Sequence, residues 1–137
     1  MTPYDPKLAD VVQRDPRYAY EAYEFVFAAL AYTQRALGRA LRESKGNEES
    51  KAHHVSGREL LQGICDFAQR EYGLMARLVF RFWGINRTDD FGEIVFTLVE
   101  AHLMSTTPDD NRGDFHDVFD LDKALVRGYR ISLDEVI

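Results

Sequence analysis

The chain has 137 residues, of which 45% are hydrophobic, and a formal net charge of −6. A chain of this length buries a core without disulfides or metals, so we expect one domain over residues 1–137. Residues 1–52 hold eight basic and eight acidic side chains, residues 53–104 five and seven, and residues 105–137 four and eight. Acidity that grows toward the C-terminal end disfavours general binding to a phosphate backbone.

The sequence gives no sign of a membrane or secreted protein. Its apolar runs are only a few residues long, and its first ten residues lack the basic and hydrophobic regions of a signal peptide. Cys65 is the single cysteine and has no partner for an internal disulfide. We therefore expect a cytoplasmic protein that does not enter a membrane, with Cys65 packed as a small hydrophobic side chain.

Two Asp-Pro pairs mark the starts of the first two helices. Asp5 and Pro6 fit the cap and first residue of a short amphipathic helix. Asp15 and Pro16 repeat the signal before a long helix from about 17 to 41. One face of the long helix carries Ala22, Phe25, Val26, Ala29, Leu30, Thr33, Leu37 and Leu41.

The long helix also has a second, aromatic face formed by Tyr20, Tyr23 and Phe27. Two apolar faces indicate either a central helix that is covered on both sides or a helix that leaves one face for a partner. The first alternative fits the need of a one-domain core for a central element. The second makes these three residues candidates for partner binding.

A polar stretch separates the long helix from the next one. Residues 42–54 contain no apolar residue larger than alanine and predict a mobile surface loop. Ser56 and Glu59 then have the spacing of a capping box, with Val55 and Leu60 placed as a hydrophobic staple. A helix is therefore predicted to start at Ser56. Its buried side is formed by Leu60, Leu61, Ile64, Phe67 and Ala68.

Residues 72–104 predict two helices on either side of a tight turn at 84–88. Gly73 and Gly84 bracket the first helix as left-handed stops, and Asp90 with Glu93 has capping-box spacing at the start of the second. The first helix carries an apolar run of Leu74, Met75, Leu78, Val79, Phe82 and Trp83. The second carries Phe91, Ile94, Val95, Leu98, Val99, His102 and Leu103 at helical spacing. We expect the two helices to share a core.

The segment after residue 104 is irregular and acidic over about 105–120. Turn-forming residues dominate it, so we expect a loop or a short hairpin that folds back onto the core. Asp120 is placed to cap a last short helix over 121–127, and residues 129–133 alternate as in an edge strand. The predicted fold is mainly α: a compact helical bundle that is either plain or winged-helix-like, with a small C-terminal β-hairpin.

A helix-turn-helix outline raises the question of DNA recognition. A recognition helix offers basic or amide side chains at its N-terminal end. The helix after residue 88 offers Asp89, Asp90 and Glu93 beside Arg87 alone. Nucleic-acid binding is therefore disfavoured, and a core scaffold with an acidic rim is favoured.

No motif of catalysis or metal binding is complete. The four histidines lack ligand spacing on one helix face, and the acidic stretch from Asp109 to Asp120 has Gly113 where a calcium loop needs an oxygen ligand. Cys65 and His102 would need a third group to form a nucleophilic site. The sequence predicts no cofactor and no metal, and gives no argument for an enzyme.

Three stretches, HVSGRELLQGI, FWGINRTDDFGEIVFTLVEAHLM and DFHDVFDLDKAL, resemble a family of small uncharacterised bacterial proteins known mainly from the Planctomycetes and Verrucomicrobia. The resemblance covers about residues 18–125. It implies a bacterial cytosolic protein. The family has no assigned activity, so no role passes to any residue here.

Three functional hypotheses remain. The leading one is a non-enzymatic regulatory or interaction domain that binds a protein partner or a second copy through Tyr20, Tyr23 and Phe27, or through the acidic residues Asp109, Asp110 and Asp114. The second is a nucleic-acid- or ribosome-associated factor that uses Arg77, Arg81 and Arg87. The third is an enzyme or ligand-binding protein with a pocket around Cys65, Trp83 and His102.

Overall fold

The structure is a computed structural model, and it describes residues 6–14, 16–45 and 54–126. These residues are mainly helical, as expected, and contain no strand. The helices are α1 (Pro6–Arg14), α2 (Tyr20–Lys45), α3 (Gly57–Tyr72), α4 (Ala76–Phe82) and α5 (Thr88–Glu100), with 3₁₀ turns η1 (Gly73–Met75) and η2 (Arg112–Phe115). Residues 121–126 form one more short helix. None of the helices in these ranges could cross a membrane.

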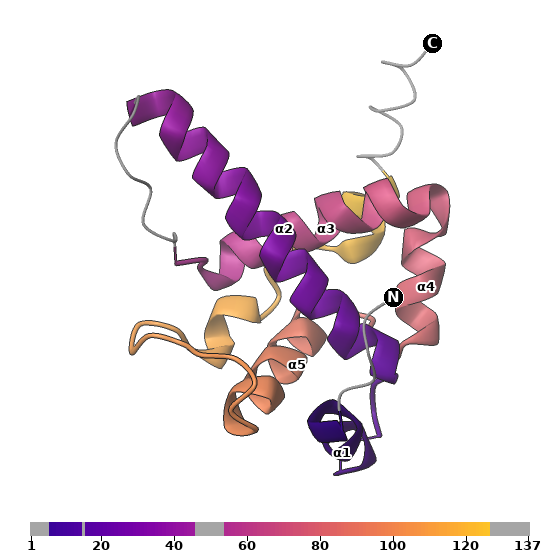
Figure 1. Cartoon of the computed structure of the whole chain (residues 1–137). Coiled ribbons are helices and arrows are strands. Elements are labelled where there is room, and N and C mark those ends of the chain that lie inside the picture. Colours follow the sequence, from indigo (N-terminus) through magenta and orange to yellow (C-terminus); the bar gives the residue numbers. More distant parts are fainter. Residues whose placement is uncertain (1–5, 15, 46–53, 127–137) are drawn as a thin grey trace.

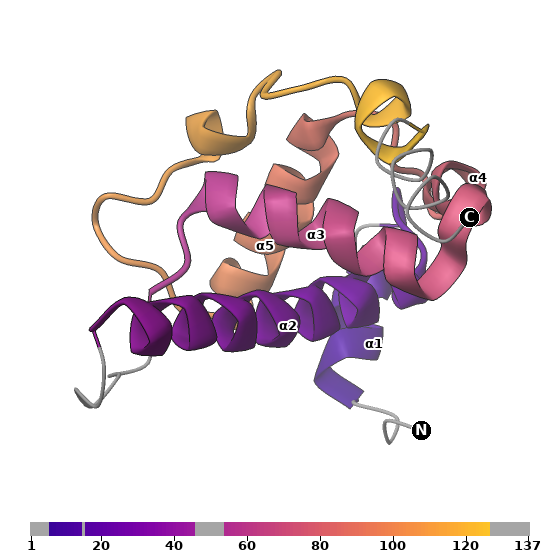
Figure 2. The ribbon, with the colours of Figure 1, turned by 90° about the horizontal axis from the view of Figure 1, so that it is seen from above.

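The long helix α2 crosses the whole molecule (Figure 1). In the view from above, α2 lies on one side, α3 and α5 lie next to it, and the segment 105–126 runs over the far side (Figure 2). Both α3 and α5 contact α2, and η2 contacts both α3 and α5. The later part of the chain therefore returns across the helices that precede it.

α2 and α3 cross at a glycine. A Cβ atom added at Gly63 would lie 1.8 Å from Oγ1 of Thr33, which is closer than any real contact. The Thr33 hydroxyl is buried and donates a hydrogen bond of 2.7 Å to the carbonyl of Ala29. The two backbones can approach this closely only because residue 63 has no side chain.

The core confirms that α2 is a central helix. Ala22, Val26 and Ala29 are fully buried on its first face, and Tyr23 of its second face is fully buried too. A cluster of rings around Phe25 joins α2 to α3 and α4, with centroid distances of 5.3 to 6.2 Å to Phe67, Tyr72, Phe80 and Trp83. Such ring pairs add to the stability that burial provides.

Several helix ends follow local sequence signals. The Ser56 hydroxyl accepts a hydrogen bond of 3.2 Å from the Glu59 amide, and the Glu59 carboxylate accepts one of 3.0 Å from the Ser56 amide. The predicted capping box is therefore confirmed. Gly73 and Gly84 have the predicted positive φ, at 55° and 89°. A Cβ at Gly84 would also lie 2.4 Å from the carbonyl oxygen of Arg17.

Three predicted boundaries are wrong. α2 begins at Tyr20 rather than at about residue 17, so Pro16 is not its first residue. α2 continues to Lys45, so the polar loop starts later than residue 42, and residues 46–53 of that loop lie outside the described residues. The capping pair of Asp90 and Glu93 does not form. Asp90 is instead the third residue of α5, and its carboxylate accepts hydrogen bonds from the amides of Asn86 and Arg87 at 2.7 and 3.0 Å.

The segment 105–120 folds back onto the core as a loop with one 3₁₀ turn. Phe115 is its buried anchor and lies between two helical glycines. A Cβ at Gly92 of α5 would lie 2.8 Å from Cβ of Phe115, and a Cβ at Gly57 of α3 would lie 3.2 Å from the Phe115 ring. The Thr88 hydroxyl donates to the Phe115 carbonyl at 2.7 Å.

The predicted β-hairpin is absent from residues 105–126, because the backbone there is held by side-chain caps and by η2. The suggested edge strand at 129–133 lies outside the described residues. The last short helix is confirmed over 121–126. Its cap is Asp120, whose carboxylate accepts hydrogen bonds from the amides of Asp122 and Lys123 at 2.8 and 3.3 Å.

Candidate functional site

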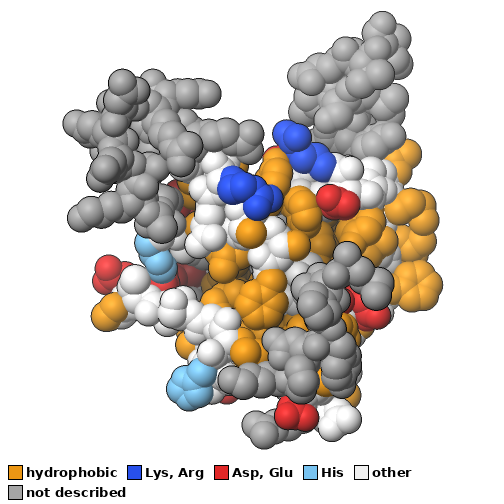
Figure 3. All heavy atoms as spheres, viewed as in Figure 1, with side chains coloured by type: hydrophobic (Ala, Val, Ile, Leu, Met, Phe, Trp, Pro, Cys, Tyr) orange, Lys and Arg blue, Asp and Glu red, His pale blue; other side chains and the backbone are white. Residues whose placement is uncertain are grey.

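A stripe of exposed hydrophobic side chains runs along η1 and α4. Phe82 is 81% exposed, Leu74 62%, Met75 54% and Leu78 44%. We call these four residues the α4 stripe. In the space-filling view, hydrophobic side chains gather over α4 at the right edge of the molecule (Figure 3). Large side chains grouped in this way on a small protein are typical of an interaction surface.

Helix geometry places the stripe away from the core. Successive residues are about 100° apart around a helix, so Leu78 and Phe82 point almost opposite to Ala76 and Phe80. Ala76 and Phe80 are fully buried. The sequence predicted that Leu78 and Phe82 join the core, and this prediction is wrong. α4 is apolar on two sides but packs against the protein on one.

The rim of the α4 stripe carries both signs of charge. Arg77 and Arg81, one turn apart on α4, both form ion pairs with Asp122, and the Arg81 pair has a distance of 3.8 Å. Arg77 also donates to the carbonyl of Ile85 at 3.0 Å and is largely buried. The Arg81 and Asp122 side chains each remain 57% exposed.

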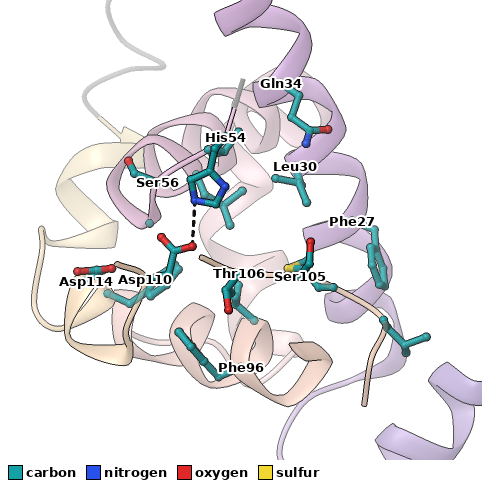
Figure 4. A pocket seen from close by; sticks show the side chains of 17 residues that line it. Phe27, Leu30, Gln34, His54, Ser56, Phe96, Ser105, Thr106, Asp110 and Asp114 are labelled. Carbon is teal, nitrogen blue, oxygen red and sulfur yellow. Dashed lines mark ion pairs between the residues drawn. The ribbon is translucent and has the colours of Figure 1, made fainter. Parts of the chain in front are cut away.

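A pocket of about 340 Å³ lies on another part of the molecule, between α2, the start of α3, the middle of α5 and the segment 103–115. Its volume is at the lower end of the range for small-molecule sites. Its apolar wall includes Phe27, Leu30, Leu60, Val95, Leu103 and Met104. Figure 4 shows Phe27 and Leu30 of α2 facing Asp110 and Asp114 across the pocket.

The polar edge of the pocket is built around Asp110. His54 Nε2 lies 2.9 Å from Asp110 Oδ2, and the same oxygen accepts a hydrogen bond of 2.9 Å from the Thr107 amide. The Asp110 side chain is only 16% exposed. Asp114 is placed beside the first turn of α3 near Gly57, and its Oδ2 accepts a hydrogen bond of 3.0 Å from the Asn111 amide.

The three residues of the predicted aromatic face lie in different environments in the structure. Tyr23 is fully buried, so it cannot contact a partner in the folded chain, and the prediction is wrong for this residue. Tyr20 is half-buried against the core. Phe27 is also half-buried and lines the pocket.

The three residues of the predicted acidic surface also lie in different environments. Asp109 is exposed and does not line the pocket, whereas Asp110 and Asp114 do. The fold thus joins Phe27, Asp110 and Asp114, which the sequence had assigned to two separate surfaces. His54 was not among the predicted residues. A histidine two residues before a helix cap carries no periodic signal that could have identified it.

None of Cys65, Trp83 and His102, around which the third hypothesis placed a site, lines the pocket around Asp110. Cys65 is buried in α3, and burial raises the pKa of its thiol to about 12. Trp83 belongs to the ring cluster around Phe25. His102 was expected on the buried side of α5, but it lies beyond the end of that helix and is exposed.

An acid and histidine pair fastens the returning segment to α5. Asp89 Oδ2 lies 2.6 Å from His116 Nδ1, and Asp89 Oδ1 accepts a hydrogen bond of 3.0 Å from the Asp117 amide. The Asp117 amide and then the His116 ring lower the pKa of Asp89, and the Asp89 carboxylate raises the pKa of His116. Within the described ranges, no three His, Cys, Asp or Glu side chains gather as a metal site.

The α4 stripe and the pocket around Asp110 are therefore the two candidate sites. One is a convex apolar surface with charges of both signs at its rim. The other is concave, with an apolar wall and an acidic edge. No protein-family model matches the chain, and comparisons with curated proteins and with solved structures found no match either.

Proposed function

We propose that this chain is a protein-interaction domain that uses the α4 stripe, and that the surface it binds is the same stripe on a second copy. The observation that carries the proposal is the exposure of Phe82, at 81% of its surface, among three other exposed large hydrophobic residues. Covering a side chain of this kind stabilises a complex by about 1.5–3 kcal/mol. Leaving it in water gives a monomer no advantage in stability.

The rim of the stripe supports a second copy as partner. A two-fold axis places the same patch on both sides of an interface, so a self-complementary patch needs both an apolar centre and charges of both signs at its edge. The α4 stripe has this composition, with Arg81 and Asp122 exposed beside it. In a two-fold arrangement each Arg81 can face an acidic group of the other copy.

The area of the α4 stripe sets the expected affinity of the dimer. Four partly exposed side chains offer less than the roughly 800 Å² that each partner buries in a standard interface. We therefore expect a weak dimer, with a dissociation constant on the order of micromolar to tens of micromolar. Such a dimer would exchange with monomer at the concentrations of ordinary solution experiments.

Sedimentation velocity over a range of concentrations tests this proposal. The native chain should shift toward the dimer as concentration rises, and Phe82→Glu should remain monomeric because it places a charge in the centre of the contact. Ala28→Glu is the matched control: it adds the same charge at an exposed site of α2 and should dimerise like the native chain. A native chain that stays monomeric throughout would refute the second copy as partner.

The nucleic-acid hypothesis has less support. α4, the turn and α5 keep a helix-turn-helix outline, so a winged-helix-like relationship remains a prediction. However, α5 is packed in the core, and Asp89 and Asp90 at its start are engaged with the neighbouring backbone. Arg77 is largely buried. Binding of duplex DNA or structured RNA that weakens with added salt would revive the hypothesis.

Three broader expectations from the sequence are retained as proposals. They are a single domain over the whole chain, a location in the cytoplasm, and membership of the bacterial family whose motifs the chain resembles. A protease-resistant fragment that spans nearly the whole chain would support the first.

A further inference from the structure

We propose that the pocket around Asp110 binds a small organic cation: a molecule with an apolar body and a protonated amine at one end. This site is separate from the α4 stripe, and none of its lining residues belongs to that stripe. The proposal rests on the shape of the pocket, the distribution of its polar groups and the sign of its charge.

The wall of the pocket suits an apolar body. Phe27 and Leu30 come from α2, Leu60 from α3 and Val95 from α5, and all four line the pocket. These four residues come from three helices that pack in the core, so the wall is formed before a ligand arrives. Preformed pockets lose less conformational entropy on binding.

The charge at the edge of the pocket selects a cation. Two carboxylates, Asp110 and Asp114, line the pocket, and none of the described lining residues is Lys or Arg. His54 is the one basic side chain there, and it already pairs with Asp110. A ligand carboxylate or phosphate would meet like charge without a compensating cation, whereas an amine would find two acceptors.

Asp110 is held in position to receive a donor. Its Oδ2 lies against His54 and accepts from the Thr107 amide, while its backbone amide donates to the Thr107 carbonyl at 3.0 Å. Oδ1 has no hydrogen-bond partner within the described part of the chain. Asp114 is fixed in the same way, through Oδ2, by the Asn111 amide. Each carboxylate is thus anchored by one oxygen and keeps the other for a ligand.

Three probes with the same apolar body and different end groups test the proposal: 4-phenylbutylamine, 4-phenylbutan-1-ol and 4-phenylbutyrate. Binding is followed by NMR shifts of pocket residues, such as the Met104 methyl group and the Thr106 amide, in titrations of the full chain. The amine should bind about tenfold more tightly than the alcohol, as expected for one charge-assisted hydrogen bond, and the carboxylate should bind more weakly than the alcohol.

Two variants and one control variant test whether Asp110 binds the amine. Asp110→Asn should bring the amine close to the affinity of the alcohol, and Asp109→Asn is the matched control, since it removes a neighbouring charge outside the pocket and should leave the amine unchanged. Gln34→Lys tests the same charge effect without a change in the loop that carries Asp110. Gln34 is an exposed position of α2 at the pocket edge, and a lysine there should weaken amine binding and strengthen carboxylate binding.

Several results would overturn the proposal: equal affinity for all three probes, tighter binding of the carboxylate, no binding of any probe, or shifts confined to the α4 stripe. The measurements do not depend on the oligomeric state. They can be repeated in Phe82→Glu, where an unchanged amine affinity is expected.

Discussion

His102 occupies a backbone position that glycine would fit better. It is the second residue after α5, with φ at 61°, and the amide of Leu103 donates back to the Leu98 carbonyl at 2.9 Å. This is the hydrogen bond of a Schellman motif, whose left-handed residue is usually glycine. The sequence placed His102 on the buried side of α5 because its spacing from Leu98 is helical. The spacing pattern contains no information on where a helix stops.

Replacing His102 by glycine should therefore stabilise the protein. The left-handed conformation costs an ordinary residue about 1 kcal/mol more than glycine, and the His102 side chain is exposed, so its burial does not offset this cost. His102→Gly should raise the free energy of unfolding in urea by up to about 1 kcal/mol. His102→Ala, which keeps a Cβ atom, should not reproduce the gain. Equal stability in both variants would refute the argument.

The pair of Asp89 and His116 should make the attachment of the returning segment depend on pH. The raised pKa of His116 means that its contribution is complete below the ordinary value of 6.5 and is lost as pH rises through the folded-state pKa. The lowered pKa of Asp89 means that its contribution is present above the ordinary value of 3.8 and is lost as pH falls through the folded-state pKa. The pair is fully charged between these limits.

An NMR titration of the imidazole signals tests this pair. His116 should titrate above 6.5 in the native chain, and Asp89→Asn should lower its midpoint. An unchanged midpoint in Asp89→Asn would show that the carboxylate does not act on the ring.

At the scale of the helices, replacing each of two helical glycines by alanine should change the stability of the protein in opposite directions. Gly63 lies where α3 crosses α2, against Thr33, whereas Gly38 of α2 has open space around the place of a Cβ atom. Gly63→Ala should destabilise the protein by about 1–3 kcal/mol through overpacking. Gly38→Ala should stabilise it by about 0.5–1 kcal/mol, because alanine loses less backbone freedom in a helix. Thermal unfolding of both variants measures the difference.

Local signals in the sequence predicted helix ends well where a residue caps the nearby backbone or allows it a positive φ. Ser56 and Asp120 cap their helices as expected, and Gly73 and Gly84 take positive φ. α4 shows the limit of this approach. Its apolar residues surround much of the helix, so spacing alone could not tell which side would find a partner in the fold. Leu78 and Phe82 were left in water because the core lies on the other side of α4, where Phe80 packs against Phe25 of α2 and Phe91 of α5.

At the scale of the whole molecule, Cys65 reports on global unfolding. Its thiol is buried in the core and its pKa is raised to about 12 by burial, so the reactive thiolate is scarce in the native state. Labelling by a thiol reagent at pH 8 should be slow and should accelerate in urea in parallel with unfolding followed by circular dichroism. Fast labelling of the native chain at a rate similar to that of free cysteine would contradict the burial.

The pocket could be predicted only in part, because its residues come from distant parts of the chain. Phe27 and Asp110 were selected from the sequence as an exposed aromatic and an exposed acid on unrelated surfaces. Their meeting depends on the return of the segment 105–120 over α3 and α5, which no periodicity encodes. His54 enters the site through the same return, since its partner is Asp110.

Phe115, inserted between Gly57 and Gly92, links this return to ligand affinity. Asp110 and Asp114 lie on the same segment as Phe115, so we expect them to leave the pocket when Phe115 is displaced, whereas the apolar wall from α2 should remain. A ligand that needs the carboxylates would therefore shift the equilibrium toward the seated form, and the fraction of seated chains would scale its apparent affinity. Amide hydrogens of residues 107–118 should then exchange more slowly as such a ligand is added, with little change in α2.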